Sequence, residues 1–132
     1  MSFTVLGTGS KLPDTVVTND DLATFLDTSD EWITTRTGIH RRHVLKQEKL
    51  IDLATVAAKN ALKNSGVTAD ELDLILCSTI QGDYVSPAFA CVVQKELGAT
   101  CPAFDVNAGC SGFIYALDVA DGYFARGRAK KV

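Results

Sequence analysis

One short run in this chain, Leu74-Ile75-Leu76-Cys77, is apolar at every position. Because the run does not alternate with polar residues, it predicts that Leu72 to Ile80 contains a parallel strand buried on both faces. Two further strands are expected, at Thr4-Val5-Leu6 and at Ala103-Phe104-Asp105-Val106. Parallel strands need crossover connections, which are usually helices, so the chain is expected to form an α/β fold.

The longest predicted helix covers about Leu50 to Ser65, where apolar residues recur at helical spacing, and Gly66 is expected to end it. Thr18 to Asp21 is expected to begin an earlier helix, with acidic residues in its first turn. Thr28 to Glu31 fits a capping box in which Thr28 is the cap. The helix that follows is expected to end near Gly38.

Two more helices are predicted toward the end of the chain. Ser86-Pro87 is expected to open one of them, with the serine as its cap and the proline at the first helical position, and Gly98 to end it. The last helix, from Ser111 to about Arg126, is apolar around nearly its whole circumference. Such a helix needs protein on most sides, so residues beyond this sequence or another chain are expected to cover it.

The composition is that of a globular protein, with 46% hydrophobic and 22% charged residues in 132 residues, a length that suits one domain. A net charge of −3 gives no general attraction to nucleic acid or to a membrane surface. No apolar run approaches the ~20 residues of a membrane span. The cysteines lack the close spacing of zinc sites, and His40 and His43 have no further ligand, so no metal site is predicted. A cytoplasmic location with reduced thiols is expected.

The strongest chemical signal lies in the segment Phe104 to Phe113, where a predicted strand meets a turn of small residues and then a helix. This order places Cys110 at or beside a helix N-terminus, whose partial positive charge favours a thiolate and whose N–H groups can hold an oxyanion. Gly109 and Gly112 leave room for a substrate. From these residues alone, a small cysteine packed at a crowded turn is an equally good interpretation.

Several segments resemble the β-ketoacyl-acyl carrier protein synthase III family of thiolase-fold condensing enzymes, and together they extend over essentially the entire chain. The stretch Asp27 to Ile39 is highly specific, whereas the cysteine segment is shared more loosely among thiolase-fold enzymes. The matching segments are Gly7-Thr8-Gly9-Ser10-Lys11-Leu12-Pro13, Val17-Thr18-Asn19-Asp20-Asp21-Leu22, Asp27-Thr28-Ser29-Asp30-Glu31-Trp32-Ile33, Arg36-Thr37-Gly38-Ile39 and Gly109-Cys110-Ser111-Gly112-Phe113.

This resemblance implies a thiolase-like fold with a mixed, mostly parallel sheet and layered helices, present here as an incomplete N-terminal half. Residues 1–132 would form the N-terminal part of the first thiolase-like domain. The resemblance makes Cys110 the nucleophile that accepts an acyl group from coenzyme A, which is a substrate and not a cofactor. The acyl-enzyme would condense with malonyl-acyl carrier protein, in a homodimer whose catalytic histidine and asparagine lie outside this chain.

Trp32 and Arg36 are four residues apart, so on a helix they share one face. A tryptophan ring can stack on adenine and an arginine can bind phosphate in two contacts. By resemblance to the family, this pair lies at the mouth of the coenzyme A tunnel with Thr28 nearby. On the residues alone, packing for Trp32 and a solvated charge for Arg36 is the favoured interpretation.

Two alternatives stay open. The first is another thiolase-fold ketosynthase or acyltransferase, of secondary metabolism. The second is a non-catalytic piece, such as an assembly half or a truncated product, and the apolar last helix supports it because exposed apolar surface promotes association. Residues beyond Val132 would discriminate between these interpretations, since a downstream histidine and asparagine would define the enzyme class.

Overall fold

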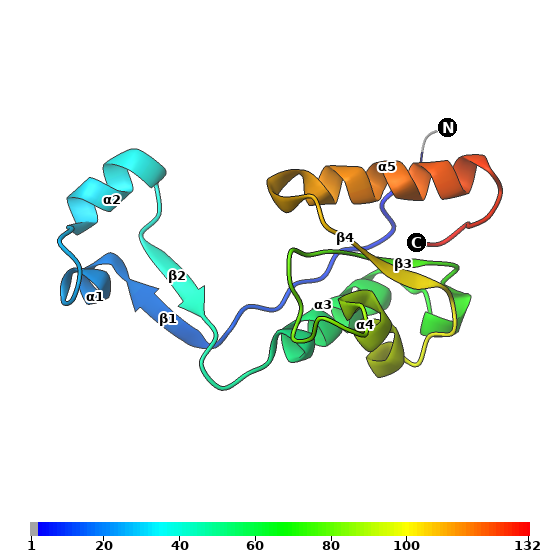
Figure 1. The fold of residues 1–132 in the computed structure, drawn as a ribbon, viewed down its shortest axis with the longest axis horizontal. Coiled ribbons are helices and arrows are strands. Elements are labelled where there is room, and N and C mark those ends of the chain that lie inside the picture. The colour runs from blue at the N-terminus through cyan, green and yellow to red at the C-terminus, as the bar shows by residue number, and fades with distance from the viewer. Residues whose placement is uncertain (1–2) are drawn as a thin grey trace. The chain divides into compact units, whose positions relative to one another are not determined.

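The computed structural model describes residues 3–132 (Figure 1). The chain forms two compact units, which we call the larger unit and the smaller unit. The larger unit holds the N-terminal segment up to Lys11 together with Leu50–Val132, and the smaller unit is Leu12–Lys49. None of the helices in residues 3–132 is both long enough and apolar enough to cross a membrane.

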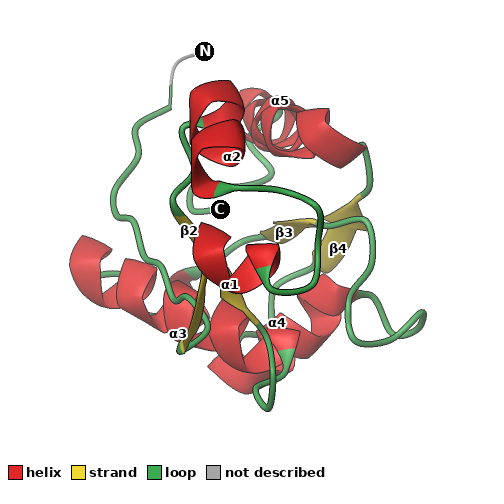
Figure 2. Cartoon of the chain, turned by 90° about the vertical axis from the view of Figure 1, so that its left-hand side faces the viewer, coloured by secondary structure: helices red, strands yellow, loops and turns green. Residues whose placement is uncertain are grey.

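The larger unit has three layers built on a parallel pair of strands. Strand β3 (Ile75–Ser78) pairs with β4 (Ala103–Val106), with Ile75 opposite Ala103. Helix α5 (Gly112–Ala125) packs on one face of this pair, and α4 (Phe89–Leu97) on the other, with α3 (Leu50–Ser65) against α4 (Figures 1 and 2). Two of the three predicted strands and the parallel pairing are therefore confirmed, as is the Leu50–Ser65 helix.

The core of the larger unit lies between these layers. It contains the fully buried Leu74 just before β3 and a row of side chains on α4, among them Ala90 and Val93. The other side of α5 is different, because Phe113, Ile114 and Tyr115 in its first turn are 65%, 62% and 54% exposed. The predicted cover for this helix is therefore incomplete within residues 3–132.

The strand predicted at Thr4-Val5-Leu6 is not formed. The segment instead runs along α3 so closely that a Cβ atom at Gly7 would lie 2.7 Å from the carbonyl oxygen of Ala61. A Cβ atom at Gly9 would lie 2.1 Å from the carbonyl oxygen of Ala57. Contact with the helix backbone therefore holds this segment, and a ladder of strand hydrogen bonds does not.

The start of helix α4 also differs from the prediction. The helix begins at Phe89, and Ser86 is not its cap. Its N-cap residue, Ala88, has no side-chain acceptor, so the cap comes from another element. The carboxylate of Asp105 on β4 accepts hydrogen bonds from the N–H groups of Phe89 and Ala90, each at 2.7 Å. These contacts satisfy two N–H groups of the first turn.

The smaller unit consists of two strands and two short helices. Strand β1 (Thr15–Thr18) pairs in antiparallel fashion with β2 (Arg41–Val44), with Thr15 opposite Val44. Helix α1 (Asn19–Ala23) begins within the predicted segment, with Thr18 as its N-cap, and α2 (Asp30–Thr37) ends at Gly38 as predicted. The sheet expected to be mixed and mostly parallel is thus realised as one parallel and one antiparallel pair, in separate units.

The N-cap of α2 is one residue later than predicted. Ser29, and not Thr28, accepts a hydrogen bond from the N–H of Trp32, at 3.1 Å. Thr28 precedes this cap, and its hydroxyl oxygen is buried without a hydrogen-bond partner in residues 3–132. The predicted capping box at Thr28 is therefore wrong, although the helix itself is formed.

Candidate active site

Cys110 is exposed and lies at the start of helix α5. It is the middle residue of a single 3-10 turn, Gly109–Ser111, which runs directly into Gly112, the first residue of the helix. The predicted placement at a helix start is therefore observed, and the alternative of a cysteine sealed in packing is excluded within residues 3–132.

Gly109 and Gly112 shape this turn for two different reasons. Gly109 has a φ of +53°, a left-handed conformation that residues with a Cβ atom rarely adopt, although a Cβ there would meet nothing within 4 Å. Gly112 has ordinary helical angles but no space, since a Cβ atom would lie 2.3 Å from the hydroxyl oxygen of Ser78 at the end of β3. The turn that carries Cys110 is thus held against the strand end.

The hydrogen bonds of the turn correct one expectation about oxyanion donors. The N–H of Ser111 donates to the carbonyl of Ala108 at 3.1 Å, and the N–H of Gly112 donates to Gly109. These two N–H groups are therefore used by the turn itself. The N–H of Cys110 is not among these two and is therefore a candidate donor within this turn.

The other three cysteines have different surroundings. The pKa of Cys77 on β3 is raised to about 11 by burial first, then by the charge of Asp105 and by Cys91. Burial also raises the pKa of Cys101. The thiol of Cys91 on α4 donates to the carbonyl oxygen of Ala103 at 3.4 Å. These surroundings are typical of packing residues.

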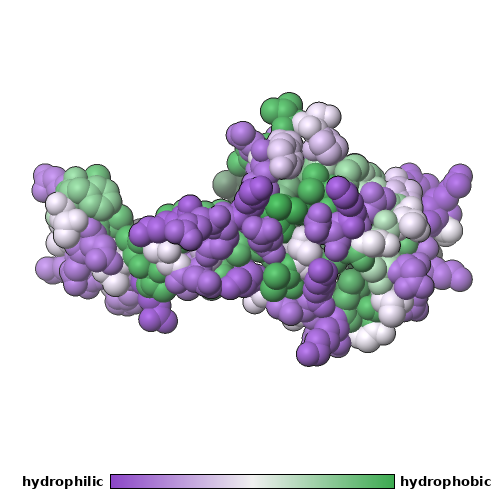
Figure 3. All heavy atoms as spheres, turned by 90° about the horizontal axis from the view of Figure 1, so that it is seen from below, coloured by the Kyte–Doolittle hydropathy of each residue, from purple (hydrophilic) through white to green (hydrophobic). Residues whose placement is uncertain are grey.

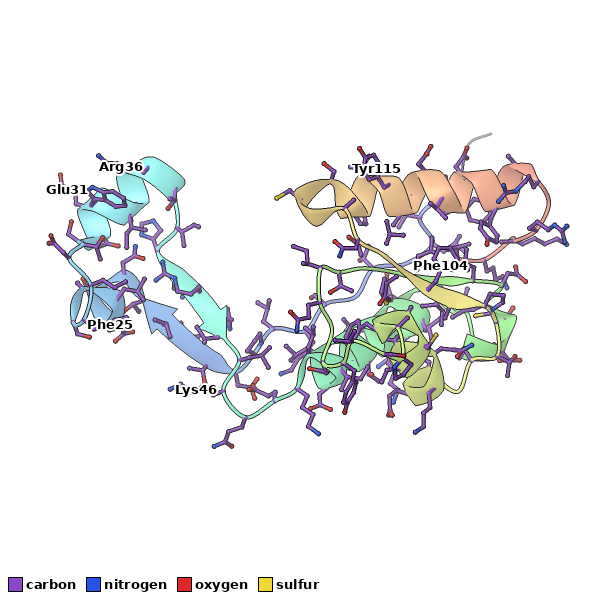
Figure 4. The ribbon with its side chains drawn as sticks, in the orientation of Figure 1. Phe25, Glu31, Arg36, Lys46, Phe104 and Tyr115 are labelled. Carbon is purple, nitrogen blue, oxygen red and sulfur yellow. The ribbon has the colours of Figure 1, made fainter. Side chains whose placement is uncertain are left out.

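Helix α2 in the smaller unit brings Trp32 and Arg36 together. The Cζ atom of Arg36 lies 4.3 Å from the centroid of the Trp32 ring, and an Arg36 Nη1 atom donates to the Trp32 carbonyl at 3.4 Å. Trp32 is 54% exposed, so much of its side chain is accessible within residues 3–132. Figure 4 shows Arg36 on α2 and Tyr115 on α5, each pointing outward from its helix. We call Trp32 and Arg36 the α2 pair.

Thr28 precedes α2 and forms no hydrogen bond with the α2 pair. Its N–H donates to the carbonyl of Leu26 at 3.0 Å, and its buried hydroxyl is unpartnered within residues 3–132. Cys110 belongs to the larger unit, whereas Thr28 and the α2 pair belong to the smaller one. The structure therefore brings Trp32 and Arg36 together, and it places Cys110 in the other unit.

A cavity of about 620 Å³ in the larger unit is not the candidate site. Its walls are mainly apolar and come from the segment Phe3–Gly9 and from α3, β3 and α5, and Cys110 is not among its lining residues. Hydrophobic residues also reach the surface of both units, between hydrophilic ones (Figure 3). Within residues 3–132, no group of three or more His, Cys, Asp or Glu side chains is arranged to hold a metal ion.

Two residues with a structural role near the candidate residues, Ser78 and Asn19, were not indicated by any sequence pattern. Ser78 fills the space that a side chain at Gly112 would need, and Asn19, the first residue of α1, is buried and contacts both ends of α2. A polar residue at a helix start usually indicates an exposed cap. Only the three-dimensional contacts distinguish a buried asparagine from such a cap.

Comparisons with known proteins show what this chain is similar to. A sequence profile for 3-Oxoacyl-[acyl-carrier-protein (ACP)] synthase III matches residues 104–132. The Beta-ketoacyl-[acyl-carrier-protein] synthase III of Caulobacter vibrioides is 54% identical over 132 residues, which is 98% of this chain and 41% of that protein. The chain thus spans about two fifths of the length of the curated relatives it matches.

Solved structures give the same result for the fold. The crystal structure of 3-oxoacyl-[acyl-carrier-protein] synthase III from Aquifex aeolicus superposes with a TM-score of 0.92 at 51% identity, covering 95% of this chain and 41% of that one. The priming beta-ketosynthase of the R1128 polyketide pathway has a TM-score of 0.89 at 35% identity, covering 96% and 38%. The resemblance and the thiolase-like fold, in incomplete form, are therefore confirmed.

Proposed function

We propose that this chain is part of a β-ketoacyl-acyl carrier protein synthase III, in which Cys110 accepts an acyl group from coenzyme A. The whole enzyme would then join this group to malonyl-acyl carrier protein in the first condensation of fatty acid synthesis. Residues 1–132 would be the N-terminal part of the first thiolase-like domain. The observation that carries the proposal is the exposed Cys110 in the glycine-flanked turn at the start of α5.

The first step transfers the acyl group to the enzyme. The sulfur of Cys110 attacks the thioester carbonyl carbon, the bond from that carbon to the sulfur of coenzyme A breaks, and coenzyme A leaves as a thiol after taking up a proton. The N–H of Cys110 is well placed to donate to the oxyanion that forms during the attack. The turn supports this step because Cys110 is exposed in it.

The second step forms the new carbon–carbon bond. Malonyl-acyl carrier protein loses carbon dioxide, and the resulting carbanion attacks the carbonyl carbon of the acyl group on Cys110. The bond to sulfur breaks, Cys110 leaves as a thiolate that takes up a proton, and β-ketoacyl-acyl carrier protein is released. The family resemblance assigns the histidine and asparagine for this step to residues outside this chain.

Coenzyme A is proposed to bind at the α2 pair. A flat ring that is half exposed suits stacking on adenine, and the Arg36 guanidinium suits a phosphate oxygen. Thr28 is the third residue of this proposed site, because its buried hydroxyl has no partner within residues 3–132. A ligand atom that bonds this hydroxyl would remove the cost of burying it unpaired.

Mass spectrometry of the complete enzyme tests the proposal. Incubation with acetyl-coenzyme A should add one acetyl group, located on the peptide that contains Cys110, and Cys110→Ala should abolish the adduct. Cys91→Ala is the matched control, since it removes another thiol and should leave the adduct in place. No adduct, or an adduct on a different residue, would contradict the proposal.

The likeness to the priming ketosynthase of a polyketide pathway favours one second candidate, a ketosynthase or acyltransferase of secondary metabolism. It uses the same acyl-cysteine, so acylation does not separate the two candidates. Turnover with malonyl groups on fatty-acid and on polyketide carrier proteins does. A clear preference for the polyketide carrier protein would replace the first proposal with the second.

The exposed first turn of α5 supports the proposal that the 132-residue chain does not catalyse condensation by itself. Its large apolar side chains lack cover within residues 3–132, which favours association over a stable site. Homodimeric assembly and a cytoplasmic location belong to the same proposal, and the four free cysteines are in keeping with a reducing compartment. Condensation by the purified 132-residue chain would overturn this part.

A further inference from the structure

Asn19 is the only buried residue of the smaller unit, every residue of which the structure describes, and its side chain is 1% exposed. A buried amide is costly unless its donors and acceptor are all paired. The centre of this unit is therefore polar, and the contacts of one side chain decide how its parts are held.

The amide of Asn19 is fully paired. Its Nδ2 atom donates to Oδ1 of Asp30 at 2.7 Å and to the carbonyl oxygen of Ile39 at 2.7 Å. Its Oδ1 atom accepts from Nη2 of Arg42 at 2.6 Å. The Nη1 atom of Arg42 also donates to the carbonyl of Val17, which connects this group to both strands.

These contacts hold both ends of helix α2. Asp30 is its first residue, and Ile39 follows Gly38, the left-handed residue that ends it. Helix α2 has no buried residue of its own, so it lacks the apolar stripe that normally fixes a helix to its neighbours. Polar contacts at its two ends, with a longer one from Nδ2 of Asn19 to the Thr34 hydroxyl at 3.4 Å, therefore set its position, and the α2 pair lies between the two ends.

We propose that Asn19 is a positioning residue that fixes α2, and with it Trp32 and Arg36, for the nucleotide end of acyl-coenzyme A. The inference rests on the proposed function, because it takes the α2 pair as the nucleotide site. Asn19 is buried, so it does not contact the nucleotide itself and affects the α2 pair through its hydrogen bonds to Asp30 and Ile39. Loss of its amide frees both ends of α2 and spreads the orientations of the α2 pair, which weakens binding of the nucleotide.

The charge state of Asp30 agrees with this arrangement. The hydrogen bond from Asn19 is the first cause that lowers the pKa of the Asp30 carboxyl. An aspartate at position 19 keeps an acceptor for Arg42 but places an oxygen against Asp30 and against the Ile39 carbonyl. Electrostatic repulsion then replaces two hydrogen bonds, so Asn19→Asp should act as strongly as Asn19→Ala.

The test compares two acyl donors with the complete enzyme. Acetyl-coenzyme A carries the nucleotide, whereas acetyl-pantetheine carries the same thioester without it. The ratio of kcat/KM for the first donor to that for the second should fall about tenfold in Asn19→Ala, which is about 1.4 kcal/mol, and the change should lie in KM. Asn64→Ala in the larger unit is the matched control. It also removes a side-chain amide, whose oxygen accepts a hydrogen bond from the N–H of Thr8, and it should keep the wild-type ratio.

A paired exchange guards against a variant that merely folds poorly. In Asn19→Asp with Asp30→Asn, the amide at position 30 can donate to the carboxylate at position 19, so the ratio should partly recover from its value in Asn19→Asp. A general loss of folding would lower kcat/KM for both acyl donors together, and a second substitution would not restore it. An equal loss for both donors therefore overturns the inference.

A third variant separates this inference from the proposed function. Arg36→Ala should lower the same ratio, because it removes a group of the nucleotide site itself. If Arg36→Ala lowers the ratio and Asn19→Ala does not, only the positioning role is wrong. If neither variant lowers it, the nucleotide site on α2 is wrong and the inference falls with it, while acylation of Cys110 is judged by mass spectrometry.

Discussion

A Cβ atom at Gly112 would lie 2.3 Å from the hydroxyl oxygen of Ser78, so β3 and the first residue of α5 touch where a side chain is missing. The same Cβ atom would lie 3.6 Å from Cβ of Ser78 and 3.6 Å from the carbonyl of Val106, which are ordinary contacts. The steric clash of a Cβ atom at Gly112 therefore comes from the Ser78 hydroxyl alone. This hydroxyl sets how closely the Cys110 turn approaches the strands.

Gly112→Ala is expected to destabilise the complete enzyme by about 1–3 kcal/mol, the usual cost of overpacking, and to slow acylation of Cys110. Gly112→Ala with Ser78→Ala should restore both, because the hydroxyl is gone and alanine suits a helix. Gly122→Ala is the control on the same helix: its Cβ meets nothing within 4 Å among residues 3–132, so it should not cause this loss of stability. Urea unfolding and the rate of acyl transfer measure these effects, and a double variant as slow as Gly112→Ala would contradict the explanation.

The four thiols should differ in reactivity. At about pH 8, iodoacetamide should label the exposed Cys110 at least about tenfold faster than Cys77, since only the thiolate reacts and a pKa of about 11 leaves little of it at Cys77. Cys101, buried and with a raised pKa, should also react slowly. Peptide mass spectrometry over a time course measures each rate.

Unfolding in guanidinium supplies the control for this experiment. Once the chain is unfolded, burial no longer raises the pKa of Cys77, so its rate should approach that of Cys110. Equal rates in the folded enzyme would show that β3 does not protect its cysteine. They would also weaken the assignment of Cys110 as the distinctive thiol.

The regular elements were predictable wherever a local pattern also fits the surroundings. The run around Leu74 gave a parallel strand, because a strand covered on both faces needs no polar alternation. The helix Leu50–Ser65 was predictable from its apolar stripe and from Gly66, which has a φ of +71°. In both cases the packing in the folded unit stabilises the same secondary structure that the local sequence pattern favours.

The errors occur where a distant residue takes over a local role. Ser86-Pro87 is a good local signal for a helix start, but Asp105 caps α4 from β4 with a charged acceptor, so the helix begins later. At Thr4-Val5-Leu6 the apolar residues favour a strand, yet contact with α3 holds the segment instead. No sequence pattern within a few residues carries this information.

The candidate site divides in the same way. Cys110 and its glycines were predictable, because a strand, a small turn and a helix in that order can only place the cysteine near a helix start. The contact between Trp32 and Arg36 was predictable from their spacing of four, whereas a role in coenzyme A binding was suggested only by the family resemblance. The role of Asn19 was not, since its partners Ile39 and Arg42 lie about twenty residues away in sequence. A buried polar centre is visible only in the folded unit.

The stacking of Arg36 on Trp32 should distinguish arginine from lysine in acyl-coenzyme A binding. Arg36→Ala is expected to raise KM for acetyl-coenzyme A about tenfold, and Arg36→Lys should recover only part of the loss, because an ammonium keeps the charge but not the planar fork. Arg126→Ala is the control, since Arg126 also lies over a ring, that of Tyr123, at 5.1 Å in the larger unit. Steady-state kinetics with varied acetyl-coenzyme A measure these effects, and full recovery in Arg36→Lys would exclude a role for the planar group.

Glu48 should make the stability of the smaller unit depend on pH. Its Oε1 atom accepts from the N–H of Asp14 at 2.9 Å, and its Oε2 atom accepts from the N–H groups of Lys46 and Gln47 at 3.4 and 3.3 Å. These bonds, that of Asp14 first, lower the pKa of Glu48 to about 2. The carboxylate thus ties the first residues of the unit to its last ones.

The sign of the effect follows from the lowered pKa. An unfolded glutamate has a pKa of about 4.3, so the folded state binds this proton less readily, and the contribution of Glu48 is present above that pH and is lost as the pH falls to about 2. The difference in unfolding free energy between wild type and Glu48→Gln should therefore be constant above about pH 5 and shrink to zero near pH 2.

Urea unfolding followed by fluorescence of Trp32, the only tryptophan in these 132 residues, measures it. Glu31→Gln reports the general effect of removing one negative charge from the same unit. If the Glu48 difference does not shrink over this pH range, the carboxylate does not hold the two ends of the unit together.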